Sequence, residues 1–238
     1  MIELTNISFT YPGVERPSLN DLSFKVAKGK LLVLCGGNGC GKTTLLCFLA
    51  GIFAKFGGKA SISGFDPAFE GQKLRKQVAY VPQNPDLYLL GSTLREDLFL
   101  GLSRQTANLP ETVSRSELLL QEFALQDDLD TPLHNLSYGQ RRKACLASAL
   151  LGRPGLLLLD EPFAGLDYSS VLHLRQTIKD NRREGITQVI AEHNLELVAD
   201  LADEFALLKA GELLAKGIKE EVAPRLIEAN VRPPCTWV

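Results

Sequence analysis

The chain has 238 residues, 45% of them hydrophobic and 23% charged, with a formal net charge of -2 and a pI near 6.0. This composition is that of a folded globular protein and excludes extended disorder. The charge balance gives no basic face for nucleic acid, and the longest apolar stretch, residues 45–54, is too short for the ~20 residues of a membrane-spanning helix.

The cysteines indicate a reducing compartment. Their number is odd and none of their spacings is that of a metal site, so free thiols in the cytosol are the simplest interpretation. The N-terminal residues lack the basic start and apolar core of a signal peptide. We therefore expect the chain to reach a membrane only through a partner.

Two kinds of strand are predicted in the first part of the chain. Residues 2–9 and 22–26 alternate apolar and polar side chains, as half-buried strands do. We expect them to be antiparallel and to cover the edge of a larger sheet. Residues 31–35 are apolar without alternation, which predicts a strand buried on both faces.

Later segments extend this buried sheet. Residues 156–159 form a second apolar run, and 187–191 and 204–208 are shorter candidates. Helical segments separate them, which predicts a parallel sheet with helices on both faces.

Between about residues 85 and 151 no core strand is evident, and 117–123 and 140–151 have helical spacing. This stretch is predicted to be a helical subdomain inserted into the sheet. No internal repeat or flexible linker appears, so residues 1–238 are predicted to form one domain. Its tail, about 223–238, is either loose or packed on a partner subunit.

A phosphate-binding loop is the clearest motif. Residues 36–43 fit G-x-x-x-x-G-K-[ST] between a predicted buried strand and an apolar helix. Glycines let the backbone aim N–H groups at phosphates, and the helix start adds its positive end. Lys42 is expected to reach the β- and γ-phosphates, Thr43 to bind Mg²⁺ and Thr44 to touch the α-phosphate.

The alternative interpretation of residues 36–43 is a glycine-rich turn that binds no phosphate. The predicted nucleotide-binding residues of this loop are Gly36, Gly37, Asn38, Gly39, Cys40, Gly41, Lys42, Thr43 and Thr44.

Two acids end the predicted strand 156–159. Asp160 lies at the carboxyl end of the strand, where ligands bind in open α/β sheets, and is predicted to hold Mg²⁺ beside Thr43. Glu161 then faces the γ-phosphate and polarises the attacking water. Taken alone, the same pattern fits a strand followed by a solvated acidic turn.

Residues 136–140, Leu-Ser-Tyr-Gly-Gln, follow as a third motif and open a helical segment. With the two sites above, they resemble the Leu-Ser-Gly-Gly-Gln signature of the nucleotide-binding subunits of ABC transporters. The resemblance runs from residue 1 to about residue 222. It implies an α/β P-loop NTPase fold: a RecA-like parallel sheet core, an antiparallel β subdomain and an inserted helical subdomain. It also implies an ATPase that uses ATP and Mg²⁺.

Further family positions occur in the expected order. Tyr11 matches the aromatic residue that stacks on adenine, although alone it would be read as a packing residue. Gln83 matches the glutamine that senses the γ-phosphate and the membrane partner, and it is counted with Thr43 and Asp160 as a Mg²⁺ ligand. His193 matches the histidine that contacts the γ-phosphate. Residues 164–167 match a loop that crosses between subunits, whereas Asp167 alone would be read as a helix cap.

The resemblance implies a dimer that encloses ATP. Residues 36–44 of one subunit would bind the phosphates, while Ser137, Gly139 and Gln140 of the other would close on the nucleotide. Glu161, His193 and Gln83 would be the catalytic residues. A monomer is therefore expected to bind ATP but to hydrolyse it poorly.

Two residues depart from the family pattern. Tyr138 replaces the first of the paired glycines in the signature, and we expect activity to survive this change. Cys40 stands where serine is usual, and its place near a helix N-terminus predicts a lowered thiol pKa and alkylation that inhibits the protein unless ATP protects it. His134 and His173 match nothing and are predicted to be surface residues.

Residues 83–86, 93–97 and Gly101 resemble the energy-coupling-factor importers of vitamins or of metal ions such as cobalt and nickel. This implies a second ATPase subunit (a homodimer or a paralogous heterodimer), a transmembrane coupling protein and, indirectly, a substrate-binding membrane protein, with no nucleic acid partner. The chain would lie at the cytoplasmic face of the membrane. Residues 87–90 would line the groove for a coupling helix or else belong to the subdomain's own core.

Other classes stay open as alternatives. These are a soluble ABC ATPase not linked to transport, and the ATPase of another importer or exporter. Soluble relatives in translation or DNA repair carry two such domains or a long coiled coil. This chain has one set of motifs and no sustained heptads, which favours the transporter.

Overall fold

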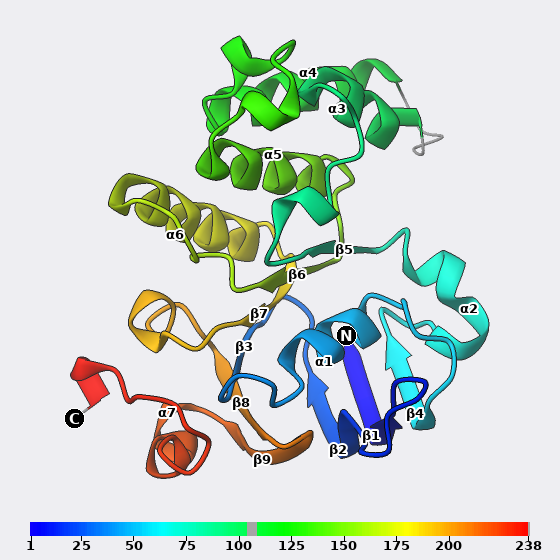
Figure 1. Ribbon diagram of the computed structural model, residues 1–238, viewed down its shortest axis with the longest axis vertical. Helices are drawn as coiled ribbons and strands as arrows, with labels where there is room; N and C mark the ends of the chain where they lie inside the picture. The colour runs from blue at the N-terminus through cyan, green and yellow to red at the C-terminus, as the bar shows by residue number, and fades with distance from the viewer. Residues whose placement is uncertain (104–108, 238) are drawn as a thin grey trace.

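The computed structural model describes residues 1–103 and 109–237 and arranges them in two sheets with helices on their faces (Figure 1). The strands are β1 (Ile2–Phe9), β2 (Leu19–Val26), β3 (Leu31–Cys35), β4 (Gly57–Ile62), β5 (Val78–Val81), β6 (Leu156–Asp160), β7 (Thr187–Ala191), β8 (Glu204–Lys209) and β9 (Glu212–Gly217). The α-helices are α1 (Lys42–Leu49), α2 (Pro67–Leu74), α3 (Leu94–Ser103), α4 (Leu109–Glu122), α5 (Tyr138–Leu151), α6 (Tyr168–Arg183) and α7 (Lys219–Val222).

The larger sheet has six strands in the order β5-β6-β7-β3-β8-β9. Neighbours are parallel from β5 to β8, and β9 pairs antiparallel with β8. The smaller sheet is antiparallel, in the order β2-β1-β4. The predicted α/β fold, with a parallel core and an antiparallel β subdomain, is confirmed.

Strand β3 shows why the core strands are apolar on both faces. Leu31 and Val33 face a core shared with α4, α5 and α6. Leu32 and Leu34 face a second core, built with α1 and the antiparallel sheet. Because successive side chains of a strand point to opposite faces, a strand covered on both sides has no polar alternation.

Helices α3, α4 and α5 follow β5 in the chain, precede β6 and lie together at the top of Figure 1. This is the inserted helical part expected from the sequence, and its subdomain limits at 85 and 151 stay a prediction. The apolar stretch 45–54 is helical only in its first half, because α1 ends at Leu49. Gly51 takes a φ of +69° just after the helix, a conformation that favours glycine and terminates helices. In the described parts of the chain, no helix is long and apolar enough to cross a membrane.

The C-terminal tail packs on the chain itself. The Gly37 amide of the phosphate loop donates a hydrogen bond to the Ala229 carbonyl at 3.0 Å. The Trp237 ring meets Phe205 of β8 edge-on, with centroids 5.0 Å apart, and the Lys219 ammonium lies 5.4 Å from the Trp237 ring centre. Neither sequence-based alternative, a loose tail or one packed on a partner, anticipated these internal contacts.

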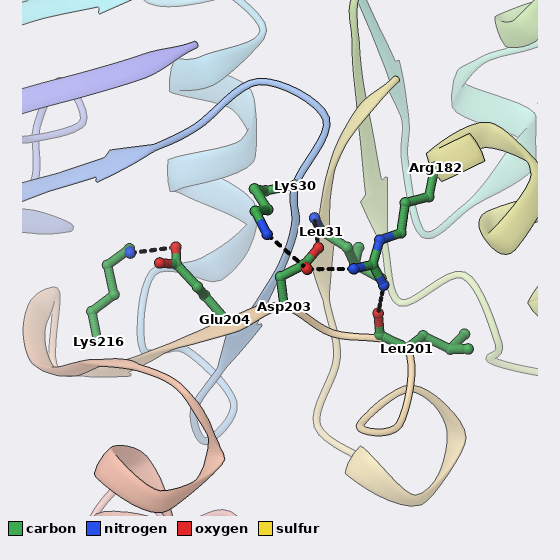
Figure 2. A network of polar contacts seen from close by, with 7 residues as sticks. All are labelled: Lys30, Leu31, Arg182, Leu201, Asp203, Glu204 and Lys216. Carbon is green, nitrogen blue, oxygen red and sulfur yellow. Dashed lines mark hydrogen bonds and ion pairs between the residues drawn. The ribbon is translucent and has the colours of Figure 1, made fainter. Parts of the chain in front are cut away.

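A polar network around Asp203 connects segments of the larger sheet and α6 at the end of β3 opposite the phosphate loop (Figure 2). The Asp203 carboxylate accepts hydrogen bonds from the Leu31 amide at 2.9 Å and from the Lys30 ammonium at 3.2 Å. It also pairs with Arg182 in the last turn of α6. The carboxylate is only 9% exposed. It therefore joins the start of β3, the end of α6 and the residue before β8.

We expect Asp203→Ala to destabilise the fold, because it leaves the Leu31 amide and two cations without their acceptor. Hydrogen bonds to a charged group of this kind contribute about 2–3 kcal/mol together, after allowance for the half-exposed cations. Scanning calorimetry should then show a Tm lower by roughly 5–10 °C. Asp130→Ala is the matched control, because it removes an exposed pair with Arg95 and should leave Tm unchanged. Equal Tm values for both variants would contradict this role for Asp203.

Candidate functional site

A cleft of about 620 Å³ opens where the phosphate loop, residues 36–44, follows β3 and where β6 and β7 end. Carboxyl ends of parallel strands meet at one edge of a sheet, which is the usual ligand edge of α/β folds. Several predicted residues converge there, joined by others that the sequence did not single out. The lining residues are Val14, Arg16, Pro17, Ser18, Asn38, Gly39, Gly41, Lys42, Thr43, Thr44, Gln83, Glu161, His193, Ala210 and Gly211.

Two glycines of the phosphate loop are required by the backbone. Gly36 has a φ of +153°, and a Cβ there would lie 2.3 Å from the Leu208 carbonyl oxygen. Gly41 caps α1 with a φ of +107°, and a Cβ there would lie 2.7 Å from the Ser18 carbonyl oxygen. Larger residues would push the loop away from β8 and from the segment before β2. The loop therefore takes its shape because these positions have no side chain.

Lys42 directs its ammonium group into the loop. The side chain is 6% exposed, and its Nζ donates to the carbonyls of Gly36 at 2.8 Å and Gly37 at 3.3 Å. A buried cation held only by neutral carbonyls is well suited to an anionic ligand, because a phosphate oxygen is a stronger acceptor. Lys42 and the α1 N-terminus together form an anion site.

Asp160 and Thr43 bring hard oxygen donors together beside the loop. The Thr43 side chain lies near enough to Asp160 to favour its ionised form, and Tyr80 donates to Asp160 Oδ2 at 3.3 Å. Burial raises the pKa of Asp160 above its usual value, against the opposing effect of Thr43. A bound cation would stabilise the ionised Asp160 carboxylate and so offset the cost of burying its charge. Within residues 1–103 and 109–237 no group of three or more His, Cys, Asp and Glu is gathered to hold a metal. The donors instead suit Mg²⁺, which takes few protein ligands and keeps phosphate and water oxygens.

Glu161, Gln83 and His193, the predicted catalytic group, line the same cleft. Gln83 Nε2 donates to Glu161 Oε2 at 2.9 Å, and His193 Nδ1 lies 3.4 Å from Glu161 Oε1. Glu161 has a φ of +43°, unusual for a residue with a side chain. Strained backbone of this kind is typical of functional sites. The sequence motifs, far apart in the chain, thus meet at one carboxylate.

Glu192 lies behind His193 and was not predicted. It is 2% exposed, and burial raises the pKa of its carboxyl group. Its Oε1 accepts the His193 and Asn194 amides at 2.9 and 3.0 Å and lies 3.4 Å from His193 Nδ1. Glu192 therefore fixes the backbone and ring of His193. An acidic residue directly after a buried strand was the available signal.

The signature residues lie outside this cleft. Ser137 is the N-cap of α5, and its hydroxyl accepts the Gln140 amide at 3.2 Å, while Gln140 Oε1 accepts the Ser137 amide at 2.8 Å. Gln140 Nε2 also donates to Asp128 at 2.8 Å. The Gln140 side chain thus completes a capping box. Gly139 lies in the first turn of the same helix. Contacts of Ser137, Gly139 and Gln140 with a nucleotide stay predictions.

Tyr11 also lies outside the residues that line the cleft. Its ring meets Phe9 and Phe53 edge-on at 5.0 and 5.6 Å, and its hydroxyl is 3.4 Å from Thr44 Oγ1. The ring is 37% exposed. The packing interpretation therefore holds in this structure, and stacking on adenine stays a prediction.

Cys40 corrects the sequence-based view of its thiol. The residue is 6% exposed, and burial raises the thiol pKa even though Lys42 nearby favours the thiolate. The expected lowering of the pKa by the helix N-terminus was therefore wrong in sign. The reason is that Cys40 points inward, toward the core built with α1, rather than toward the open end of the loop.

Three further residues with sequence-based expectations lie away from the cleft. His173 is partly exposed: its ring packs against Phe123 with centroids 5.2 Å apart, and its Nε2 is buried. His134 is exposed, as predicted. Asp167 caps α6 by accepting the Ser170 amide at 2.7 Å.

Among cleft residues missed from sequence, Arg16 and Ser18 precede β2, and Ala210 and Gly211 form the turn between β8 and β9. The Asn20 amide bonds to the Gly211 carbonyl at 2.8 Å. The fold, rather than any motif, brings these segments to the phosphate loop.

Comparisons with known proteins agree with this geometry. Residues 19–164 match the family described as ABC transporter. The chain is 35% identical over 234 residues to the cobalt import ATP-binding protein CbiO of Rhodobacter capsulatus, covering 96% of this chain and 83% of that protein. It is 32% identical over 242 residues to the energy-coupling factor transporter ATP-binding protein EcfA of Methanothermobacter thermautotrophicus, covering 99% and 78%.

A solved structure extends the match to the fold. The cbiO1 protein of Clostridium perfringens, described as part of the ABC transporter complex cbiONQ, has a TM-score of 0.79 and 27% identity, covering 99% of this chain and 96% of that one. The family match spans the phosphate loop and Glu161, and the relatives align along nearly the whole chain. The chain therefore belongs to the ABC transporter family and is an ATP-hydrolysing subunit of that family.

Proposed function

We propose that the cleft binds MgATP through the phosphate loop. The loop amides, the α1 N-terminus and Lys42 hold the phosphates, and Thr44 lies beside Thr43 at the start of the helix. Oxygens of Thr43, Asp160 and Gln83 hold Mg²⁺. The metal, when bound, neutralises charge on the phosphates. The support is the buried Lys42 ammonium and the paired oxygens of Thr43 and Asp160.

Glu161 is the general base of the proposed reaction. Its carboxylate accepts a proton from the attacking water, and Gln83 and His193 hold that carboxylate from two sides. Glu192 keeps His193 in place. His193 then contributes hydrogen bonding to the charge that develops on the γ-phosphate.

A second ATPase subunit completes the site. Ser137 is exposed at the start of α5 and lies outside the cleft of its own chain, although its motif is part of the family pattern. A helix start with free amides is suited to a phosphate. We assign Ser137 and Gly139 to the nucleotide of the facing subunit, taken here as a second copy of this chain. This position of Ser137 is the observation on which the dimer rests.

The transporter is an importer of the energy-coupling-factor class, for a vitamin or a transition-metal ion. Two relatives support this, named for cobalt import and for the energy-coupling factor. A transmembrane coupling protein would hold the chain at the cytoplasmic face of the membrane. Its docking groove is a second cavity, of about 790 Å³, close to Gln83. The groove is lined by Asp86, Leu89, Gly91, Ser92, Thr93, Pro132, Leu133, His134 and Arg141.

Residues 87–90 have features of both roles considered from sequence. Leu87 and Leu90 are 74% and 67% exposed, and they stand in the chain on either side of Tyr88 and Leu89, of which Leu89 lines the groove. Tyr88 and Leu89 pack against the core of the helical part. The exposed leucines give a coupling helix an apolar contact, and the Arg141–Asp86 pair at 3.1 Å borders it.

Coexpression with the transmembrane coupling protein of the same organism tests this role. We expect a purified complex, and we expect Leu87→Asp to reduce its yield at least tenfold, because a charge would be buried at the contact. Leu118→Asp is the matched control: Leu118 is 65% exposed on α4, a helix that contributes no residue to the groove lining, whereas Leu87 lies in the chain between the lining residues Asp86 and Leu89. A Leu87→Asp chain that copurifies as well as the control would contradict the proposed groove.

A further inference from the structure

Tyr138 occupies the signature position where the family has glycine, and it contacts two other motifs. Its hydroxyl donates to the Gln83 carbonyl at 3.0 Å. Its ring lies against Gly165, where a Cβ would sit 3.0 Å from the ring atom Cε1. Gly165 has a φ of +71° and no side chain, which leaves room for the ring. One side chain at the start of α5 thus meets both the Gln83 loop and the loop before α6.

Arg142, one turn further along α5, holds the same segments. It is fully buried, and its Nη1 donates to the carbonyls of Pro82 at 2.8 Å and Gln83 at 2.6 Å. Its Nη2 donates to the Glu161 carbonyl. The guanidinium also lies 5.9 Å from the centre of the Tyr138 ring. The Gln83 carbonyl therefore accepts from two side chains of α5.

These contacts continue to the catalytic carboxylate. The main chain of Gln83 is held by α5, and its side-chain Nε2 donates to Glu161 Oε2 at 2.9 Å. Ser137, the cap of α5, directly precedes Tyr138. The start of α5 is therefore connected, through the backbone carbonyl of Gln83, to Glu161, the proposed general base.

We propose that Tyr138 is a positioning residue for ATP hydrolysis, acting through Gln83. Its hydroxyl fixes the Gln83 backbone, so that the amide keeps Glu161 oriented for proton transfer. The inference rests on the proposed function, in which Ser137 serves the nucleotide of the facing subunit and Gln83 serves its own. The Tyr138–Gln83 hydrogen bond then connects the two nucleotide sites of a dimer through one helix. The glycine of the family signature has no side chain to make this connection.

Tyr138→Phe tests the role by removing one oxygen atom. We expect kcat to fall about fivefold, as for the loss of one neutral hydrogen bond, with KM for ATP changed less than twofold, because the phosphate loop is untouched. Tyr138→Gly should lower kcat at least as much. In a Gln83→Ala background, Tyr138→Phe should change kcat less than twofold, since its effect passes through the Gln83 side chain.

Ser148→Ala is the matched control. Ser148 lies on α5, ten residues after Tyr138 and outside the cleft. Its hydroxyl donates to Asp97 of α3 at 2.8 Å. The variant should lose a hydrogen bond at least as strong, because the acceptor is a carboxylate, without losing kcat. An equal fall in kcat for both variants, or a Tyr138→Phe effect undiminished by Gln83→Ala, would reduce Tyr138 to general support of the helix and overturn the inference.

Glu161→Gln separates this inference from the proposed function. If Glu161→Gln is inactive while Tyr138→Phe keeps wild-type kcat, the positioning role is wrong and the proposed function stands. If Glu161→Gln hydrolyses ATP normally, the proposed chemistry is wrong and the role of Tyr138 is lost with it.

Discussion

Glu161→Gln is expected to lower kcat for ATP hydrolysis by about 10²–10⁴-fold, the contribution typical of a positioned general base. Glutamine matches glutamate in shape but accepts no proton from water. Steady-state phosphate release measures kcat, and equilibrium binding of an ATP analogue measures affinity. Affinity should change less than threefold, because glutamine keeps the size and shape of the Glu161 side chain and the substitution removes no group of the phosphate loop in the same cleft.

Glu117→Gln provides the control for this change. Glu117 is exposed on α4, outside the cleft. Its replacement by glutamine removes one negative charge, as Glu161→Gln does. It should keep wild-type kcat. A Glu161→Gln variant with kcat within threefold of the control would assign the water-activating role to another group.

Lys42→Met is expected to weaken ATP binding by roughly 100-fold. The Lys42 ammonium is buried among the carbonyls of the phosphate loop, and each charge-assisted hydrogen bond to phosphate contributes about 1.5–3 kcal/mol. Two such bonds at the lower end of this range, about 3 kcal/mol together, correspond to about two orders of magnitude in Kd. Methionine keeps the length of the side chain, so the loss reports the charge. Isothermal titration calorimetry gives the Kd directly.

Lys28→Met is the matched control, since Lys28 is exposed before β3, at the end of the strand opposite the phosphate loop. Its Kd should equal that of the wild type. If Lys42→Met also bound ATP with an unchanged Kd, the phosphates would lie elsewhere in the molecule.

The buried strands were predictable because their sequences report their surroundings. Leu156–Asp160 and Leu31–Cys35 are covered on both faces, so an unbroken apolar run was a sufficient signal. Strands β4, β5 and β9 were not predicted. β5 and β9 form the edges of the larger sheet and are only partly buried, so their sequences carry weaker patterns. β4 begins with two glycines, which give a strand no side-chain pattern.

The candidate site was predictable where a short motif carries the chemistry. The phosphate loop with Lys42 follows the predicted strand 31–35, Asp160 and Glu161 follow the predicted strand 156–159, and the cleft brings the loop and Glu161 together. Gln83 and His193 came from the family resemblance, and they meet Glu161 in the structure.

Whether a side chain faces the core or the cleft was not predictable from the same motifs. Cys40 was expected to be reactive because a helix start lowers a thiol pKa, but its side chain faces the core and desolvation is the larger effect. Arg142 and Tyr138 act through the backbone carbonyl of Gln83. No residue pattern encodes such an acceptor, so only the fold reveals it.

We propose that ATP is enclosed between the phosphate loop of one subunit and Ser137 of another. The most direct test is the solution mass of Glu161→Gln, measured by light scattering after size-exclusion chromatography with and without MgATP. We predict the 26.1 kDa mass of one chain without nucleotide and twice that mass with it, and we predict that adding Ser137→Arg abolishes the dimer. A Glu161→Gln chain that binds ATP and keeps the mass of a monomer would contradict the claim.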